Sequence, residues 1–180
     1  MIDLKEHIRT VPDFPIPGIQ FRDITSLIEN PNCLHDITVK FLDYSSRYKA
    51  DVIVGIESRG FVFGSPVAWD MGVPFVMARK PGKLPNETFK KSFDLEYGST
   101  SLEIQKNTDI SADSKIIIID DLIATGGTAL ACADLLHENW HIPKEQIVIL
   151  SVIDLPDLKG SAIIREQGYN VHTLIEFEGG

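Results

Sequence analysis

The clearest pattern in the sequence is a set of short, almost wholly apolar segments that alternate with longer amphipathic ones. The apolar segments are residues 51–56 (DVIVGI), 74–78 (PFVMA), 115–120 (KIIIID) and 146–153 (QIVILSVI). Segments of this length without a polar face are typical of parallel strands that helices cover on both sides. They therefore predict the strands of a buried sheet.

The segments between these strands have apolar residues every three to four positions, which predicts helices. We expect helices at 31–48, 61–71 and from Gly126 onward, a short one after Pro156, and a closing strand at 170–176. Strands that alternate with helices predict an α/β fold, an open, mostly parallel twisted sheet flanked by helices. No repeat or linker divides the chain, so we expect a single domain over residues 1–180.

The remaining segments are polar or rich in proline. The first fifty residues are expected to form a helical entry region, within which the prolines of 12–17 enforce an extended path. Residues 79–91 predict a mobile loop because they are polar and rich in Lys and Pro. Residues 92–97 and 101–106 alternate in polarity around Gly98, which is typical of a hairpin.

Composition and charge limit the partners and the location that we expect for the protein. The chain has 180 residues, with 17 Lys and Arg against 26 Asp and Glu, a formal net charge of −9. This balance argues against a nucleic acid or an anionic membrane as a partner held by net charge. The opening residues lack the apolar core of a secretory signal, and Cys33 and Cys132 fit a reducing compartment. We therefore expect a cytoplasmic protein.

The segment that leaves the isoleucine-rich strand combines acids with small residues. Asp120 and Asp121 are followed by Leu122 and Ile123, and then by the run Ala124, Thr125, Gly126, Gly127 and Thr128. The small residues offer backbone N–H groups, two hydroxyls and a helix N-terminus, a combination that binds phosphate. The acids would repel phosphate, so they should face sugar hydroxyls or a hydrated Mg²⁺. The alternative is an ordinary strand-to-helix turn with solvated acids.

Two further loops follow strands at the edge of the sheet where ligands bind in such folds. Glu57, Ser58 and Arg59 follow the strand at 51–56, and Arg59 could donate a forked pair of hydrogen bonds to an anion. A basic trio follows the strand at 74–78: Arg79, Lys80 and Lys83. The alternatives are a surface cation for Arg59 and a solvated loop for the trio.

These motifs together resemble a known family. The run IIIIDDLIATGGT is similar to the phosphoribosyl-pyrophosphate motif of type I phosphoribosyltransferases. The segments FPIPGIQFRDIT, GIESRGFVFG, ARKPGKLP and SFDLEYGSTSLEIQK resemble the adenine-specific members, and the resemblance covers most of the chain. It implies the type I phosphoribosyltransferase fold and Mg²⁺-dependent transfer of a phosphoribosyl group to adenine, giving AMP and pyrophosphate in purine salvage.

The resemblance also implies roles for individual residues. It places a pyrophosphate-binding loop with a cis peptide at Glu57–Ser58, the 5′-phosphate at 124–128, and the ribose hydroxyls against Asp120 and Asp121. In the family, the residues at Arg79, Lys80 and Lys83 bind pyrophosphate partly across a dimer interface, so we expect a homodimer. Mg²⁺ is expected to be held mainly by substrate and water near the two aspartates, with no direct protein ligand.

The base pocket is assigned in the same way. Residues 1–35 would form an N-terminal hood, in which Phe21 stacks on adenine opposite Leu122 and the backbone of Gln20 and Arg22 contacts its edge. Gln20 departs from the family, whose members often have an apolar residue there. Residues 83–96 would form a lid loop. Glu96, with Arg59 and Asp121, completes the expected catalytic set, and Tyr97 borders the lid.

Bland alternatives remain for the base pocket and for the overall function. Phe21 could be a core residue, Glu96 an exposed acid at a strand end, and Tyr97 a half-buried aromatic. A sister enzyme for xanthine, hypoxanthine or orotate would share the phosphate loop. A ligand-sensing transcription regulator of the same fold is a further alternative, although no helix-turn-helix is evident.

Overall fold

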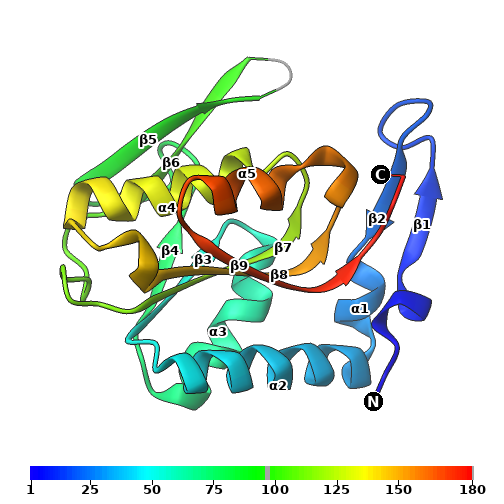
Figure 1. The fold of residues 1–180 in the computed structure, drawn as a ribbon, viewed down its shortest axis with the longest axis horizontal. Coiled ribbons are helices and arrows are strands. Elements are labelled where there is room, and N and C mark those ends of the chain that lie inside the picture. Colours follow the sequence, from blue (N-terminus) through cyan, green and yellow to red (C-terminus); the bar gives the residue numbers. More distant parts are fainter. Residues whose placement is uncertain (96–97, 180) are drawn as a thin grey trace.

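A five-stranded parallel sheet forms the centre of the protein, in the order β4-β3-β7-β8-β9 (Figure 1). The computed structural model describes residues 1–95 and 98–179. Its strands are β1 (Arg9–Pro12), β2 (Gln20–Asp23), β3 (Val52–Ile56), β4 (Phe75–Ala78), β5 (Thr88–Asp94), β6 (Ser99–Gln105), β7 (Ile116–Ile123), β8 (Ile147–Asp154) and β9 (Asn170–Glu176). Its helices are α1 (Thr25–Glu29), α2 (Pro31–Tyr48), α3 (Arg59–Met71), α4 (Gly127–Trp140) and α5 (Gly160–Glu166), with 3-10 turns η1 (Leu4–His7), η2 (Lys144–Gln146) and η3 (Pro156–Leu158).

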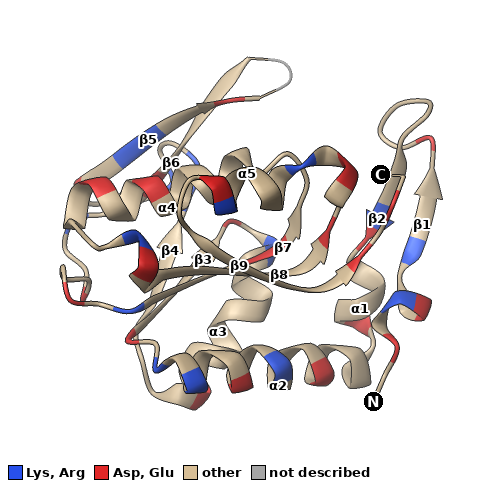
Figure 2. Cartoon of the chain, in the orientation of Figure 1, with Lys and Arg blue, Asp and Glu red and all other residues tan. Residues whose placement is uncertain are grey.

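Two layers of helices cover the sheet, α2 and α3 on one face and α4 and α5 on the other (Figure 1). Strand β7 lies in the middle and alternates between the two cores. Ile117 and Ile119 pack with the α2 and α3 side, whereas Ile116 and Ile118 pack with the α4 side. All four are fully buried, as the apolar run predicted. Figure 2 shows that charged residues lie mainly on the helices and the hairpins outside this sheet.

Helix α2 begins and ends where its sequence predicts. The Asn30 side chain accepts hydrogen bonds from the N–H groups of Asn32 and Cys33, and Pro31 occupies the first turn, where no N–H is needed. Lys49 ends the helix in a left-handed conformation. The α/β fold class and the main strands and helices of the sheet are confirmed.

The helical entry expected over the first fifty residues is confirmed in part. It contains η1, α1 and α2, but residues 9–23 form an antiparallel hairpin instead, in which β1 pairs with β2 and Thr10 lies opposite Arg22. The proline-rich segment forms the long connection between these strands and includes a cis bond at Phe14–Pro15. Each strand has only four residues and no fully buried position, so neither shows the apolar pattern of a core strand.

A second hairpin, β5–β6, extends beyond the sheet beside α4, and we call it the arm (Figure 1). Its first strand starts at Thr88, so the expected loop over 79–91 ends earlier, and much of the expected 83–96 lid loop is strand. Phe89 packs edge-on against Trp140 with ring centroids 5.0 Å apart, and Lys91 Nζ lies 2.7 Å from Glu138 Oε1. These contacts with α4 stabilise β5 as a strand, although its polar composition predicted a loop for the first part of this segment.

Both cysteines are fully buried in the two cores, Cys33 on α2 and Cys132 on α4. Burial raises the pKa of each thiol above its usual value. No helix within the described ranges is long and apolar enough to cross a membrane.

Candidate functional site

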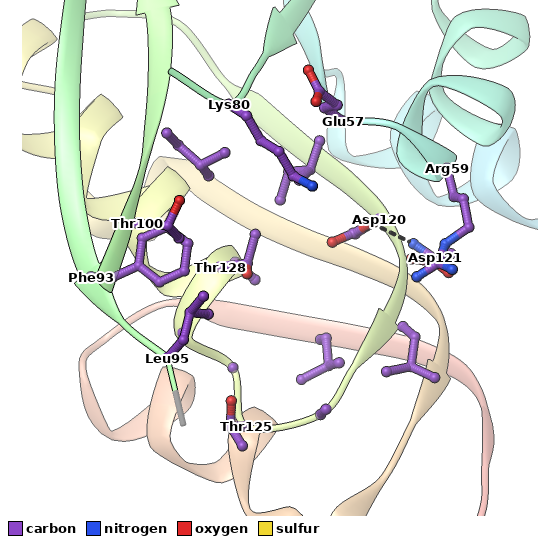
Figure 3. A pocket seen from close by; sticks show the side chains of 18 of the residues that line it. Glu57, Arg59, Lys80, Phe93, Leu95, Thr100, Asp120, Asp121, Thr125 and Thr128 are labelled. Carbon is purple, nitrogen blue, oxygen red and sulfur yellow. Dashed lines mark hydrogen bonds and ion pairs between the residues drawn. The ribbon is translucent and has the colours of Figure 1, made fainter. Parts of the chain in front are cut away.

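A cavity of about 630 Å³ opens at the carboxyl ends of β3 and β7 (Figure 3). Most of the residues predicted from the sequence to follow these strands meet there. The wall includes Glu57, Ser58, Arg59, Lys80, Asp120, Asp121, Leu122, Ala124, Thr125, Gly126, Gly127 and Thr128. The volume lies in the usual range for a small-molecule site.

The phosphate loop, residues 124–128, comprises the connection from β7 at 124–126 and the first two residues of α4. Gly126 has φ +85°, a left-handed conformation that favours glycine. Helix α4 begins at Gly127, and its first turn has no side-chain cap within the described chain. Its N-terminal N–H groups are therefore available to an anion, and the helix dipole adds to the attraction. The hydroxyls of Thr125 and Thr128 flank the same turn (Figure 3).

The two acids differ in their surroundings although they are adjacent. Asp121 is only 7% exposed at its side chain, and its Oδ2 lies 2.7 Å from Arg59 Nε. Burial raises the pKa of Asp120 well above its usual value, and the neighbouring Asp121 charge raises it further while Arg59 partly opposes this. The site therefore holds one carboxylate paired with Arg59 and, next to it, a carboxyl whose pKa is raised.

The loop after β3 contains a cis peptide at Glu57–Ser58, which confirms that expectation. Glu57 Oε1 accepts a hydrogen bond from Arg79 Nε at 2.7 Å, so Arg79 is held against the loop. Among the described residues, Lys80 is the member of the basic trio that lines the cavity, and Arg79 and Lys83 do not. Arg79 thus links the loop after β4 to the loop after β3, and Lys80 brings its amine to the cavity.

The expected hood residues do not belong to the wall of the cavity. Within the described chain, Gln20, Phe21 and Arg22 are absent from the lining and form β2 instead. Phe21 packs edge-on against Phe14, and the Arg22 guanidinium lies 4.4 Å from the centre of the Phe177 ring. Their roles toward adenine stay predictions.

The arm supplies wall residues to which the sequence analysis assigned no role. Phe93, Leu95 and Thr100 line the cavity beside the phosphate loop, and Phe93 lies next to Gly127 (Figure 3). The alternation along 92–97 indicated a strand, but nothing in it showed that the strand would cross over α4 to this loop. Glu96 and Tyr97 lie outside the described residues.

The donors on the cavity wall suit a hard cation. Glu57, Asp120 and Asp121 present carboxylate oxygens, the ligand type that Mg²⁺ prefers, but Glu57 and Asp121 are engaged by Arg79 and Arg59. No group of three or more His, Cys, Asp or Glu residues in the part of the chain described here could enclose a metal. These carboxylate oxygens could hold a hydrated Mg²⁺, which usually binds proteins through only one or two carboxylates.

Comparisons with known proteins agree with this geometry. The sequence model of the phosphoribosyl transferase domain matches residues 23–154. The chain is 48% identical to the adenine phosphoribosyltransferase of Erythrobacter litoralis, over 98% of this chain and 97% of that one. The structure resembles the enzyme from Giardia lamblia complexed with 9-deazaadenine (TM-score 0.89, 34% identity, 97% of this chain and 96% of that one). It also resembles the enzyme from Saccharomyces cerevisiae bound to an imino-altritol bisphosphate and adenine (TM-score 0.85, 40% identity, 96% and 97% covered).

The raised pKa of Asp120 gives a testable dependence of stability on pH. In the folded state its pKa lies above the unfolded value near 4, so ionisation of Asp120 costs stability as the pH rises through the folded-state pKa. Asp120→Asn removes this cost. We expect its melting temperature to exceed that of the wild type by a few degrees at about pH 8 and to match it at about pH 4.

Thermal melts across this pH range check the expectation, with Asp113→Asn, an exposed acid, as the matched control. The control should follow the wild type at every pH. A difference between Asp120→Asn and wild type that does not grow with pH would contradict the assignment.

Proposed function

The chain belongs to the phosphoribosyltransferase family and transfers the phosphoribosyl group of phosphoribosyl pyrophosphate to adenine, giving AMP and pyrophosphate, and on that premise we propose how its residues divide the work. One observation supports the division most directly: the phosphate loop, the aspartate pair and Arg59 line a single cavity. Each group has a different chemistry, and each matches one part of the sugar pyrophosphate.

The phosphate loop binds the 5′-phosphate. The N–H groups at the start of α4 and the hydroxyls of Thr125 and Thr128 donate to its oxygens. Glycines at 126 and 127 let the backbone approach, because no side chain stands between it and the ligand. Binding at this end fixes the ribose, so the base attacks a carbon whose position is set in advance.

Asp121 and Asp120 face the ribose hydroxyls, and the loop at 57–59 binds the pyrophosphate. As the bond to pyrophosphate breaks, the sugar gains the positive character of a ribosyl oxocarbenium ion. Arg59 and Lys80 donate to the departing oxygens, and Asp121 keeps Arg59 oriented through their 2.7 Å contact. Catalysis at this site is chiefly positioning and charge stabilisation.

Adenine binds on the hood side of the ribose. Leu122 covers one face of the ring from the cavity wall, and Phe21 covers the other when the hood closes on the base. The Gln20 and Arg22 backbone contacts the edge of the ring, and Glu96 accepts or relays its proton. The arm, which includes part of the 83–96 segment, closes over the site and excludes water.

Magnesium would be held near Asp120 and Asp121, mainly by the substrate and water. When bound, it neutralises charge on the pyrophosphate. The protein's own residues orient the ligand around it.

We also propose a cytoplasmic location, as expected from the sequence.

We propose that the active form is a homodimer. Val62 and Trp69 lie two turns apart on α3, next to the edge strand β4 with its Met77, and all three are exposed, Trp69 to 84%. An apolar surface beside an open sheet edge is typical of an interface between copies, and the segment that contains Arg79 and Lys83 follows β4 along the chain. Sedimentation at assay concentration should give a dimer, and Trp69→Glu should shift it toward monomer. A wild-type monomer would contradict the proposal.

A panel of bases tests the reaction itself. AMP should form from adenine and phosphoribosyl pyrophosphate with Mg²⁺, and formation should cease when the metal is chelated. Xanthine, hypoxanthine and orotate should react far more slowly. A preference for one of them would assign the chain to a sister enzyme, and failure of all bases would indicate a non-catalytic relative.

Asp121→Asn tests the role of the paired aspartate. The substitution keeps the shape of the side chain but weakens its hold on Arg59 and on the ribose, so kcat/KM should fall by about 100-fold. The melting temperature should change little. Near-normal AMP formation by this variant would reject the role, and Asp113→Asn again serves as the control for charge alone.

A further inference from the structure

Gly160, the first residue of α5, lies against the back of the phosphate loop. A Cβ atom added to it would meet Ala124 O and would lie 2.6 Å from Gly126 N and 2.7 Å from the Thr125 carbonyl carbon. A Cβ on Gly126 would in turn lie 2.8 Å from Gly160 O. The two glycines therefore face each other, and their backbones are in direct contact.

The backbone conformation of Gly160 does not itself require glycine. Its φ lies outside the left-handed region, unlike that of Gly126, and it begins an ordinary helix. An alanine at this position would suit the helix better than glycine does. The contact with the phosphate loop is thus the physical reason for a glycine here.

Two interactions fix Gly160 at this distance. Ser161 Oγ donates a hydrogen bond of 2.7 Å to Asp154 Oδ2, and both residues are buried. Leu155 N donates to Ile123 O at 3.0 Å, so the chain leaving β8 is tied to the last residue of β7. The start of α5 is therefore held against the loop by the end of the neighbouring strand.

We propose that Gly160 is a positioning residue for the 5′-phosphate, with Ser161 and Asp154 setting its place. Gly160 itself does not line the cavity; it supports Thr125 and Gly126 from behind, so that their N–H groups keep the curvature that fits a phosphate. This inference rests on the proposed role of the phosphate loop. It assigns a function to a segment about 35 residues from the motif.

Gly160→Ala tests the proposal, because it should lower the affinity for the 5′-phosphate end of the substrate and for no other part of it. Calorimetric titration with ribose 5-phosphate, pyrophosphate and adenine separates the three parts of the site. Ribose 5-phosphate should bind about 10- to 100-fold more weakly to the variant, because a loop displaced by about 1 Å loses its fit. Pyrophosphate and adenine should bind as they do to the wild type. The KM for phosphoribosyl pyrophosphate should rise, and the KM for adenine should not.

Ile164→Ala is the matched control, since it loosens the same helix without adding an atom near the loop. It should lower the melting temperature and leave the affinity for ribose 5-phosphate unchanged. Unchanged affinity for ribose 5-phosphate in Gly160→Ala, or an equal loss for all three ligands, would overturn the proposal.

Ser161→Ala tests the positioning role of Gly160 if Gly160→Ala does not fold. It adds no bulk, but it removes the hydrogen bond to Asp154, so a selective severalfold loss of ribose 5-phosphate affinity supports the proposal and unchanged affinity overturns it. Thr128→Ala distinguishes the two levels of inference. If Thr128→Ala weakens ribose 5-phosphate and the α5 variants do not, only the positioning role fails. If none of these variants weakens it, the phosphate loop itself is misassigned.

Discussion

The burial of β7 on both faces is the constraint on which the rest of the structure depends. Its four isoleucines alternate between two separate cores, so a shift of one residue would exchange every side chain between them. The strand is thereby fixed along its length, and its last polar residues must emerge at the same edge of the sheet. Because β7 is central, the loops after β3 and β8 are brought to its end as well. The position of the site follows from apolar packing that takes no part in the chemistry.

The polar groups at this edge of the sheet lower the stability of the fold, and the two adjacent aspartates are the clearest example. Two adjacent carboxyls are partly withdrawn from water, one of them with a raised pKa, and Arg59 compensates only Asp121 directly. A protein selected for stability alone would not place acids there. Their presence is understandable because a sugar with several hydroxyls needs acceptors in fixed positions, and an anionic leaving group needs cations close by. The net charge of −9 makes these local cations more important, since the field of the whole chain opposes an anionic ligand.

How far the sequence predicts the structure depends on how local the responsible interactions are. The α2 helix, the core strands and the phosphate loop could be predicted because each is encoded in one contiguous segment. The β1–β2 hairpin could not, because its pairing joins short, exposed strands across a proline-rich connection. In β5 the inward positions are Phe89, Lys91 and Phe93. Lys91 interrupts the apolar alternation that would predict a strand, and its charge is paired with Glu138 only in the folded protein. The contribution of Phe93 to the cavity and the contact of Gly160 with the loop arise only from tertiary packing. Of the expected hood residues and the basic trio, Lys80 is the one that lines the cavity among the described residues, because spacing along the chain does not show which side chains of a loop point inward.

The state of the two cysteines has a practical consequence for following the arm in solution. Both thiols are enclosed in the cores, and their raised pKa values keep them protonated near neutral pH, so they react slowly with alkylating reagents. A cysteine introduced at an exposed arm position, such as Lys90→Cys, would be the only fast-reacting thiol on the described surface. A fluorophore attached there could report arm movement during turnover without any need to replace the native cysteines.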